Sequence, residues 1–130
     1  MPFEELLDLI VSITLEKGGA TADLAEGRLL TAEDYWYFPR HPDRTQVVPL
    51  EDLGSAVRSY IEANLPVLTG GGVYLGTWVN PGTQECYLDL TARAQERREA
   101  LLRAWLHSKE GNRRILSIYN PVAGETAYLQ

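Results

Sequence analysis

The candidate side chains for catalysis or metal binding in this sequence of 130 residues are few, and they share no motif. They are one cysteine, Cys86, two histidines, His41 and His107, and Asp89 at the end of a predicted strand. A nucleophilic cysteine needs a base within hydrogen-bond reach, and no histidine lies near Cys86 in the sequence. A single cysteine excludes a multi-cysteine zinc site, and two unrelated histidines are poor zinc ligands. The sequence therefore predicts no catalytic residue, no metal site and no cofactor.

Each of these features also has a structural interpretation, which we favour. Cys86 alternates with Tyr87 along a strand and is typical of a small core thiol. Asp89 precedes Thr91 at the start of a predicted helix, where carboxylates commonly accept hydrogen bonds from helix-initiating amides. The glycine run at 70–72 leads into a strand, whereas phosphate loops open a helix. A small enzyme with a site at the sheet edge, using Asp89, His41 or Cys86, stays open as an alternative.

Aromatic residues are the best candidates for binding. Side chains alternate between the two faces of a strand, so Tyr35 and Tyr37 separate from Trp36 and Phe38. One aromatic set would then lie on an open sheet face and bind a partner, while burial in the core or in a homodimer is the competing interpretation. The candidate binding residues of this kind are Tyr35, Trp36, Tyr37, Tyr74, Trp78 and Tyr87.

Arginines gather in the last third of the chain and form a second candidate feature. A helix there and the segment after it would present a basic side made of Arg93, Arg97, Arg98, Arg103, Arg113 and Arg114. Of these, we add Arg97 and Arg98 to the candidate binding residues. Such a basic side could bind nucleic acid, could contact an acidic segment of a partner or of this chain, or could simply be a solvated helix surface. The net charge of −6 disfavours unspecific attraction to nucleic acid and to anionic lipid.

Hydrophobic periodicity predicts the elements of the first half of the chain. Apolar residues at helical spacing predict a helix from Phe3 that ends near Gly18-Gly19. Residues 20–49 lack that period, and their aromatic run predicts two strands, paired as a hairpin, with a third short strand at 45–48. Residues 50–65 repeat at three and four positions and predict a second helix that ends before Pro66.

A β-hairpin and a third helix are predicted in the second half. Strand-forming residues at 73–79 and 85–90 flank the turn Asn80-Pro81-Gly82-Thr83. Thr91 is placed to cap the next helix, and strands follow at 115–119 and 126–129. The apolar stripe of that helix comprises Ala94, Leu101, Leu102, Trp105 and Leu106. The order predicts one α+β domain over residues 1–130, a two-layer sandwich in which three helices cover an antiparallel sheet of five to six strands.

Composition agrees with an ordinary folded domain. Hydrophobic residues make up 45% of the sequence and charged residues 23%, which excludes a disordered or fibrous chain. No apolar run approaches the roughly 20 residues that span a bilayer. The first ten residues carry acids rather than the basic segment of a signal peptide, and the lone cysteine suits a reducing compartment. We therefore expect a cytoplasmic protein that does not enter the membrane.

Part of the sequence resembles small uncharacterised α+β proteins of actinobacteria and their phages. In those proteins a Tyr-x-Gly-x-Trp strand, a turn, a Tyr-Leu-Asp-x-Ser/Thr strand, a helix and a final strand follow one another. The corresponding segments here are 74–82, 87–91, the arginine-rich helix and 115–119. After the final strand this chain has Asn120-Pro121, where those proteins tend to carry an acidic residue. The resemblance implies a phage or mobile-element setting and no particular activity.

Together these features favour a non-catalytic, protein-binding accessory or regulatory protein. The missing catalytic motif, the surplus of aromatic residues and the acidic balance motivate this prediction. The sequence does not identify the partner. Besides the enzyme, a nucleic-acid-binding module that uses the arginine-rich third helix stays open as an alternative.

Overall fold

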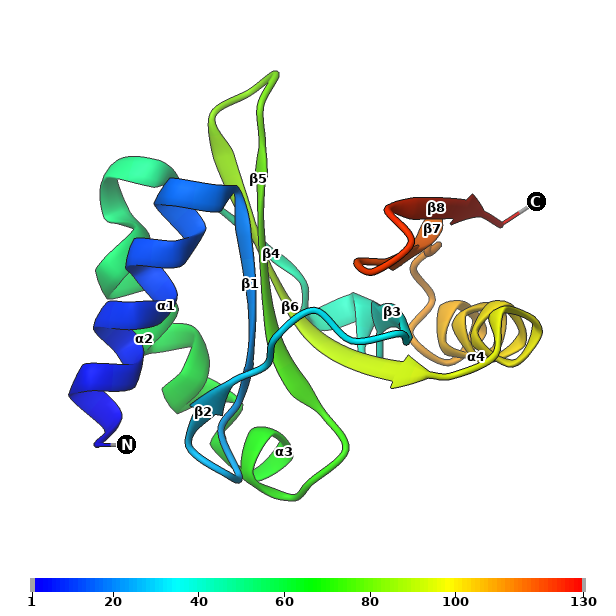
Figure 1. The fold of residues 1–130 in the computed structure, drawn as a ribbon, viewed down its shortest axis with the longest axis horizontal. Coiled ribbons are helices and arrows are strands. Elements are labelled where there is room, and N and C mark those ends of the chain that lie inside the picture. Colours follow the sequence, from blue (N-terminus) through cyan, green and yellow to red (C-terminus); the bar gives the residue numbers. More distant parts are fainter. Residues whose placement is uncertain (1, 130) are drawn as a thin grey trace.

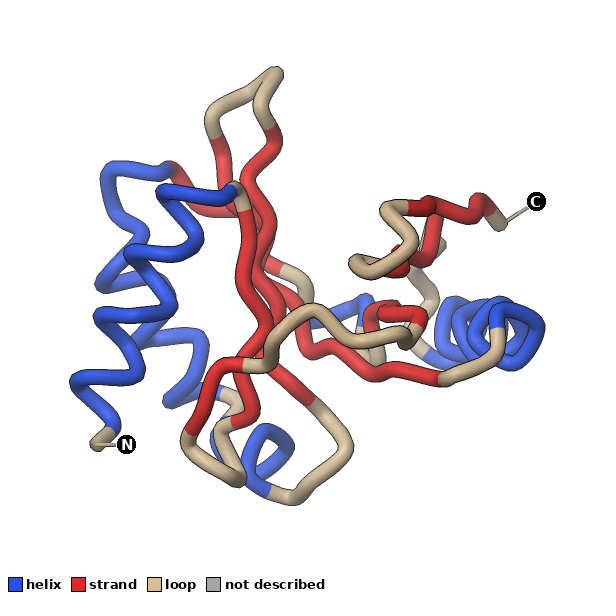
Figure 2. The backbone as a smooth tube through the Cα atoms, in the orientation of Figure 1, coloured by secondary structure: helices blue, strands red, loops and turns tan. Residues whose placement is uncertain are grey.

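The structure is a computed structural model that describes residues 2–129. Figures 1 and 2 show helices on two sides of a curved sheet. The α-helices are α1 (Phe3–Lys17), α2 (Leu53–Ala63), α3 (Leu65–Thr69) and α4 (Arg97–Glu110), and the 3-10 helices are η1 (Pro42–Arg44) and η2 (Leu50–Asp52). The strands are β1 (Gly19–Asp23), β2 (Arg28–Leu29), β3 (Trp36–Pro39), β4 (Gln46–Pro49), β5 (Tyr74–Asn80), β6 (Glu85–Ala94), β7 (Ser117–Asn120) and β8 (Glu125–Tyr128).

All strands belong to one antiparallel sheet in the order β2-β1-β5-β6-β3-β7-β8, and β4 also pairs with β6. Strand β6 is the central element, because β5 pairs along one side of it while β3 and β4 share the other. The predicted α+β class with helices on an antiparallel sheet is confirmed. The sheet has eight strands and the described chain has four α-helices, more than the five to six strands and three helices predicted.

Every second residue of β6 points to the same face of the sheet, and these residues contribute to two hydrophobic cores on that face. Cys86, Leu88 and Leu90 belong to a first core, and Ala92 and Ala94 belong to a second. Because the sheet twists and bends, helices α1 and α2 lie on the left and α4 on the right in Figure 1, although all of them pack on this one face. We call it the helix face, and the opposite side the open face.

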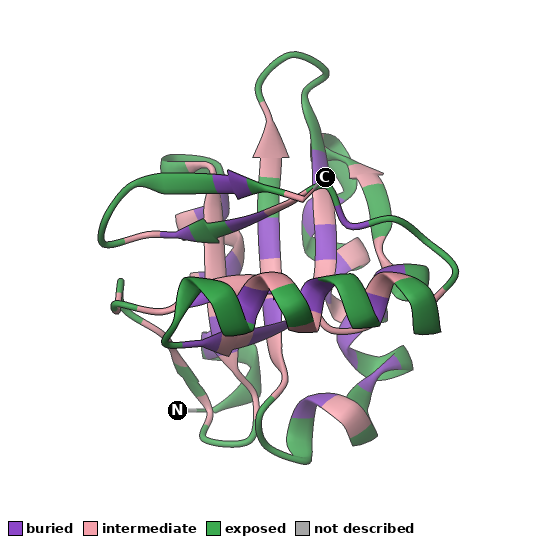
Figure 3. Ribbon diagram, turned by 90° about the vertical axis from the view of Figure 1, so that its right-hand side faces the viewer, coloured by how far each residue is buried: buried purple, intermediate pink, exposed green. Residues whose placement is uncertain are grey.

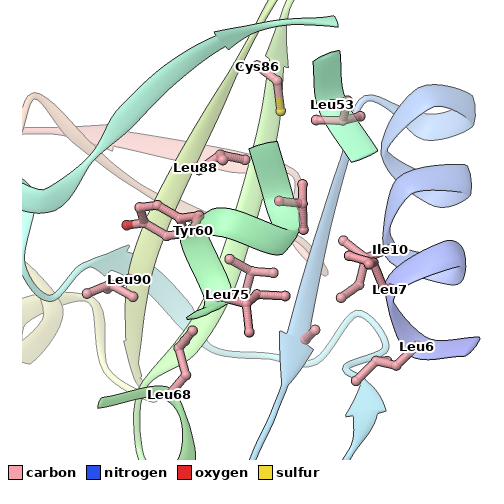
Figure 4. Packing of buried hydrophobic residues seen from close by; sticks show 13 residues of the cluster. Leu6, Leu7, Ile10, Leu53, Tyr60, Leu68, Leu75, Cys86, Leu88 and Leu90 are labelled. Carbon is pink, nitrogen blue, oxygen red and sulfur yellow. The ribbon is translucent and has the colours of Figure 1, made fainter. Parts of the chain in front are cut away.

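The first core is built from large side chains of α1, α2, α3, β5 and β6 that point toward one another in Figure 4.

A buried polar network joins α1 to the sheet beside it. The Thr14 hydroxyl donates to the Ile10 carbonyl at 2.7 Å and lies 2.6 Å from the Thr77 hydroxyl, which accepts a hydrogen bond from the Ala20 amide at 2.9 Å. The polar groups at this helix–sheet contact are therefore satisfied.

The second core is smaller, and alanines make up a large part of it. Trp36 and Phe38 of β3 face Ala92 and Ala94 of β6, and α4 contributes only Ala100 and Ala104 as buried apolar residues. Ile115, Ile118 and Ala127 complete it. Small side chains let α4 approach the sheet closely.

Several predicted elements are confirmed by the structure. Helix α1 ends where predicted, because Gly18 adopts a left-handed φ of 86° and its amide bonds to the Thr14 carbonyl. The β5–β6 hairpin forms around the predicted turn at 80–83.

The start of the third predicted helix is wrong. Strand β6 continues to Ala94, so Thr91 is a buried strand residue and not a helix cap. Helix α4 begins at Arg97, and its preceding residue, Glu96, makes no side-chain capping bond. The strand continues because Ala92 and Ala94 pair with Phe38 and Trp36, a long-range contact that the local sequence does not show.

Two other boundaries differ from the prediction. The aromatic strand β3 does not form a hairpin with its predecessor, since β1 pairs with the short β2 and β3 pairs with β6 and β7. Pro66 does not end the helical region, because it lies in the first turn of α3, where its missing N–H is not needed. These differences leave the layers of the fold as predicted.

Candidate functional site

The open face of the sheet brings together most of the predicted aromatic residues. Trp78 pairs with Tyr87 across β5 and β6, Tyr74 pairs with Thr91, and Tyr37 of β3 pairs with Arg93. Directly opposite residues of antiparallel strands share a face, so all of these side chains lie on the side without helices. Among them, Tyr37, Tyr74, Trp78 and Tyr87 were candidate binding residues.

Trp78 and Tyr87 form the exposed end of this face, near the tip of the hairpin that projects in Figure 1. Their ring centroids lie 5.5 Å apart with the ring planes tilted by 59°. Trp78 is 51% exposed, and Val47, which lies opposite Tyr87 on β4, is 41% exposed. We call these three residues the hairpin patch. Two exposed apolar side chains beside a half-buried tyrosine on three paired strands are suited to binding a protein surface.

The other end of the open face is an ordered cluster around Arg93. Its guanidinium lies 4.0 Å from the centroid of the Tyr35 ring and 5.1 Å from that of Tyr74. It donates hydrogen bonds to Glu33 at 3.2 Å and to the Tyr37 hydroxyl at 3.3 Å. Arg93 thereby holds Glu33 and Tyr35, in the loop before β3, on the sheet.

Between the two ends, Gly76 explains the glycine of the Tyr-x-Gly-x-Trp pattern. A Cβ atom at this position would collide with the hydroxyl of Thr91, which lies directly opposite Tyr74 on the neighbouring strand. The threonine side chain therefore covers the glycine backbone.

Three predicted binding residues lie away from the open face. Trp36 is buried in the second core, on the helix face, so its assignment to a binding surface is wrong. The Arg97 guanidinium lies 5.8 Å from the centroid of the Trp36 ring, and Arg98 is exposed in the first turn of α4. For Trp36 the cause is strand alternation, which directs it opposite to Tyr37, whereas the two arginines belong to helix α4.

Asp89 lies in the middle of β6, and its carboxyl accepts a hydrogen bond from the hydroxyl of Thr45, which precedes β4. The predicted role as a helix cap is therefore wrong, since no helix begins there. Burial raises the pKa of the Asp89 carboxyl, while the Thr45 hydrogen bond and the charge of Arg113 lower it. This carboxylate is held in a fixed geometry at the point where β6 changes partner from β4 to β3.

The residues of the enzyme alternative do not converge. Cys86 is buried in the first core on the helix face, and Asp89 points to the other side of the same strand. Burial raises the pKa of the Cys86 thiol, which keeps it in the unreactive protonated form. His41 lies instead in a small hollow of about 140 Å³ with His107 and Glu110. Within residues 2–129, no three His, Cys, Asp or Glu side chains are placed to hold a metal.

The arginines do not form one continuous basic side. Arg93 belongs to the open-face cluster, Arg103 lies over Phe38, and Arg113 donates to the Thr45 carbonyl. A hollow of about 390 Å³ does gather cations at the end of α4. Its lining comprises Trp105, Ser108, Lys109, Asn112, Arg113, Arg114, Ile115 and Leu129. Three cations and no acid line this hollow, a charge that suits an anionic group.

Sequence reasoning missed the surface of α4. Leu102, Trp105 and Leu106, which were predicted to face the core, are 58%, 48% and 43% exposed. Ala100, Ala104 and His107 are buried instead. Figure 3 shows exposed residues along the outer side of this helix, with no other segment in front of it. The two alanines, spaced four residues apart, were the available signal for a close helix–sheet contact.

Comparison with protein-family models, with curated proteins and with solved structures finds no match to this chain. The resemblance to small actinobacterial and phage proteins stays a prediction. In the part of the chain that the structure describes, no helix has the length and apolar character needed to cross a membrane.

Proposed function

We propose that this protein is a non-catalytic binding domain that acts as an accessory or regulatory factor and contacts a protein partner through the hairpin patch. The observation that carries the proposal is the half-exposed Trp78, in tilted ring contact with Tyr87 on the open face of the sheet. Tryptophan and tyrosine dominate the binding energy of many protein interfaces when they are presented on a rigid support. A phage or mobile-element setting is part of the same proposal.

The support beneath the patch is rigid. Strands β5 and β6 pair over seven residues, from Tyr74–Thr91 to Asn80–Glu85. Behind Trp78 and Tyr87, the other faces of these strands are anchored in the first core by Leu75, Cys86 and Leu88. A partner would therefore meet aromatic side chains that lose little conformational freedom on binding.

Charge favours a partner with a neutral or basic surface. The chain carries a net charge of −6, and Glu85, exposed at the start of β6, lies beside the patch. An acidic surface around an aromatic centre steers basic partners and repels acidic ones. The lack of convergence among Cys86, Asp89 and His41 supports binding over catalysis.

The test compares partner capture by Trp78→Ala with capture by Leu15→Ala. Leu15 is 57% exposed on α1, in the helix layer, and serves as the matched control for removing an exposed apolar side chain. A partner recovered from host lysate should bind the Trp78 variant about tenfold or more weakly, while the Leu15 variant binds like the wild type. Equal binding by all three proteins would remove the hairpin patch as the interface.

A further inference from the structure

Helix α4 exposes three of its four large apolar residues and buries its small ones, while Leu101 is partly buried against the second core. Ala100 and Ala104 are fully buried against the sheet, whereas Leu102, Trp105 and Leu106 remain about half exposed on the outer side. A surface helix of a globular protein ordinarily shows the reverse, with its large apolar stripe facing the core. A contiguous apolar stripe on the outside marks an interaction surface.

We propose that this surface pairs with α4 of a second copy of the chain, in antiparallel orientation about a two-fold axis. Glu99, Leu102, Leu106 and Lys109 are spaced by three, four and three residues along α4. That alternation of three and four forms a single seam along a helix, as in coiled coils. The seam has leucines in the middle and charges of opposite sign at its two ends.

The order of charges selects a second copy as the occupant. When two such helices run antiparallel with Leu102 against Leu106 of the second copy, Glu99 of each copy lies against Lys109 of the other. The two-fold axis repeats each contact, so two leucine pairs are framed by two ion pairs. A parallel pair would instead oppose Glu99 to Glu99 and Lys109 to Lys109, which is unfavourable.

The flank of the seam adds an aromatic contact. Trp105 lies beside the seam, and the Lys109 ammonium of the same chain already lies 5.3 Å from the centroid of its ring. In an antiparallel pair the same flanks of both helices adjoin, so the two Trp105 rings meet near the axis. Arg98, on that flank, comes within reach of Trp105 of the second copy.

The rest of the molecule permits this arrangement. Figure 3 shows α4 along the front of the molecule with its outer side uncovered. The hairpin patch is built on β4, β5 and β6 and shares no residue with the seam on α4, so the two proposed contacts use different residues. Repulsion between two copies of charge −6 is screened beyond about 8 Å at physiological ionic strength.

The expected dimer is weak. Helix α4 has 14 residues and is therefore about 21 Å long. One pair of such helices buries less than the roughly 1,600 Å² of a standard interface. We expect a monomer–dimer equilibrium with a dissociation constant in the micromolar range.

Sedimentation velocity over a range of protein concentrations tests the proposal with single and paired charge reversals. Lys109→Glu or Glu99→Lys alone places like charges against each other, and each should weaken dimerisation about tenfold or more. The double variant Glu99→Lys with Lys109→Glu restores opposite charges and should dimerise nearly like the wild type. Leu106→Asp should be monomeric throughout the range.

Two results would overturn the proposal. One is a wild-type protein that stays monomeric into the hundreds of micromolar. The other is a dimer in which the double reversal fails to rescue either single reversal, or which Leu106→Asp does not disrupt. Circular dichroism of each variant serves as the folding control, and because the substituted side chains are exposed, the monomer fold should persist.

Discussion

The two ends of the sheet are covered by helices in opposite ways. Over β1, β5 and the first half of β6, α1 and α2 bury large aliphatic side chains, and the Thr14–Thr77 network satisfies the polar groups beneath them. Over β3 and the end of β6, α4 buries alanines and turns Leu102, Leu106 and Trp105 outward. The first layer is complete within one chain, whereas the second has apolar surface left over for another molecule.

His107 shows that the polar groups beneath α4 are less well satisfied than those beneath α1. Its ring is buried and stacked on Phe38, with ring centroids 5.8 Å apart. Its Nδ1 atom lies 3.3 Å from Arg40 and 3.5 Å from Glu110, but its Nε2 atom has no hydrogen-bond partner in the part of the chain that the structure describes. A buried polar atom without a partner costs stability, so the α4 layer is less optimised for folding than the α1–α2 layer.

The largest expected effect contrasts one leucine from each layer. Leu88→Ala empties part of the first core, where this side chain is fully buried, and should lower the free energy of unfolding by about 2–5 kcal/mol. Leu102→Ala removes an exposed side chain and should change it by no more than about 0.5 kcal/mol in the monomer. Urea unfolding at low protein concentration measures both values. A loss at Leu102 as large as at Leu88 would mean that the stripe of α4 is part of the core.

A smaller effect concerns pH and sharpens the contrast at His107. Burial, with the charge of Arg40 as a lesser cause, lowers the pKa of His107 below its ordinary 6.5, and burial also lowers that of His41. As the pH falls, His107 and His41 therefore take up protons in the unfolded chain before they do so in the folded protein. The contribution of the two neutral histidines to stability is constant above about pH 6.5 and is lost as the pH falls below that value. Each histidine adds a slope of at most about 1.4 kcal/mol per pH unit.

Replacing one histidine isolates its share of this pH dependence. His107→Leu should lose less stability than the wild type between pH 7 and pH 5, because only His41 then titrates in this way. Asp89 acts in the opposite sense, since burial raises the pKa of its carboxyl, but it is present in both proteins and cancels from the comparison. Identical pH profiles of thermal unfolding would show that His107 is not shielded from water.

Local patterns predicted much of the first layer and of the hairpin. Apolar spacing and the glycines at 18–19 marked α1, and Asn80-Pro81-Gly82-Thr83 marked the turn. Alternation in the aromatic run correctly separated Tyr37 from Trp36, because the period of a strand is fixed by its backbone. Which of the two faces the helices cover depends on long-range packing, and therefore the burial of Trp36 was not predicted.

The second layer was the part that local patterns described least well. The extension of β6 to Ala94 depends on pairing with β3, which is more than fifty positions earlier in the sequence. The periodicity of α4 was recognised, but periodicity alone does not say which stripe faces the sheet. Ala100 and Ala104 face it because close approach to Trp36 and Phe38 leaves no room for leucine.

Hydrogen–deuterium exchange at low and high protein concentration tests the contrast between the two layers most directly. If α4 is completed by a second copy, amides within 97–110 should exchange more slowly at high concentration, while those of α1 at 3–17 stay unchanged. Exchange in α4 that is independent of concentration, or a slowing shared equally by α1, would contradict the account.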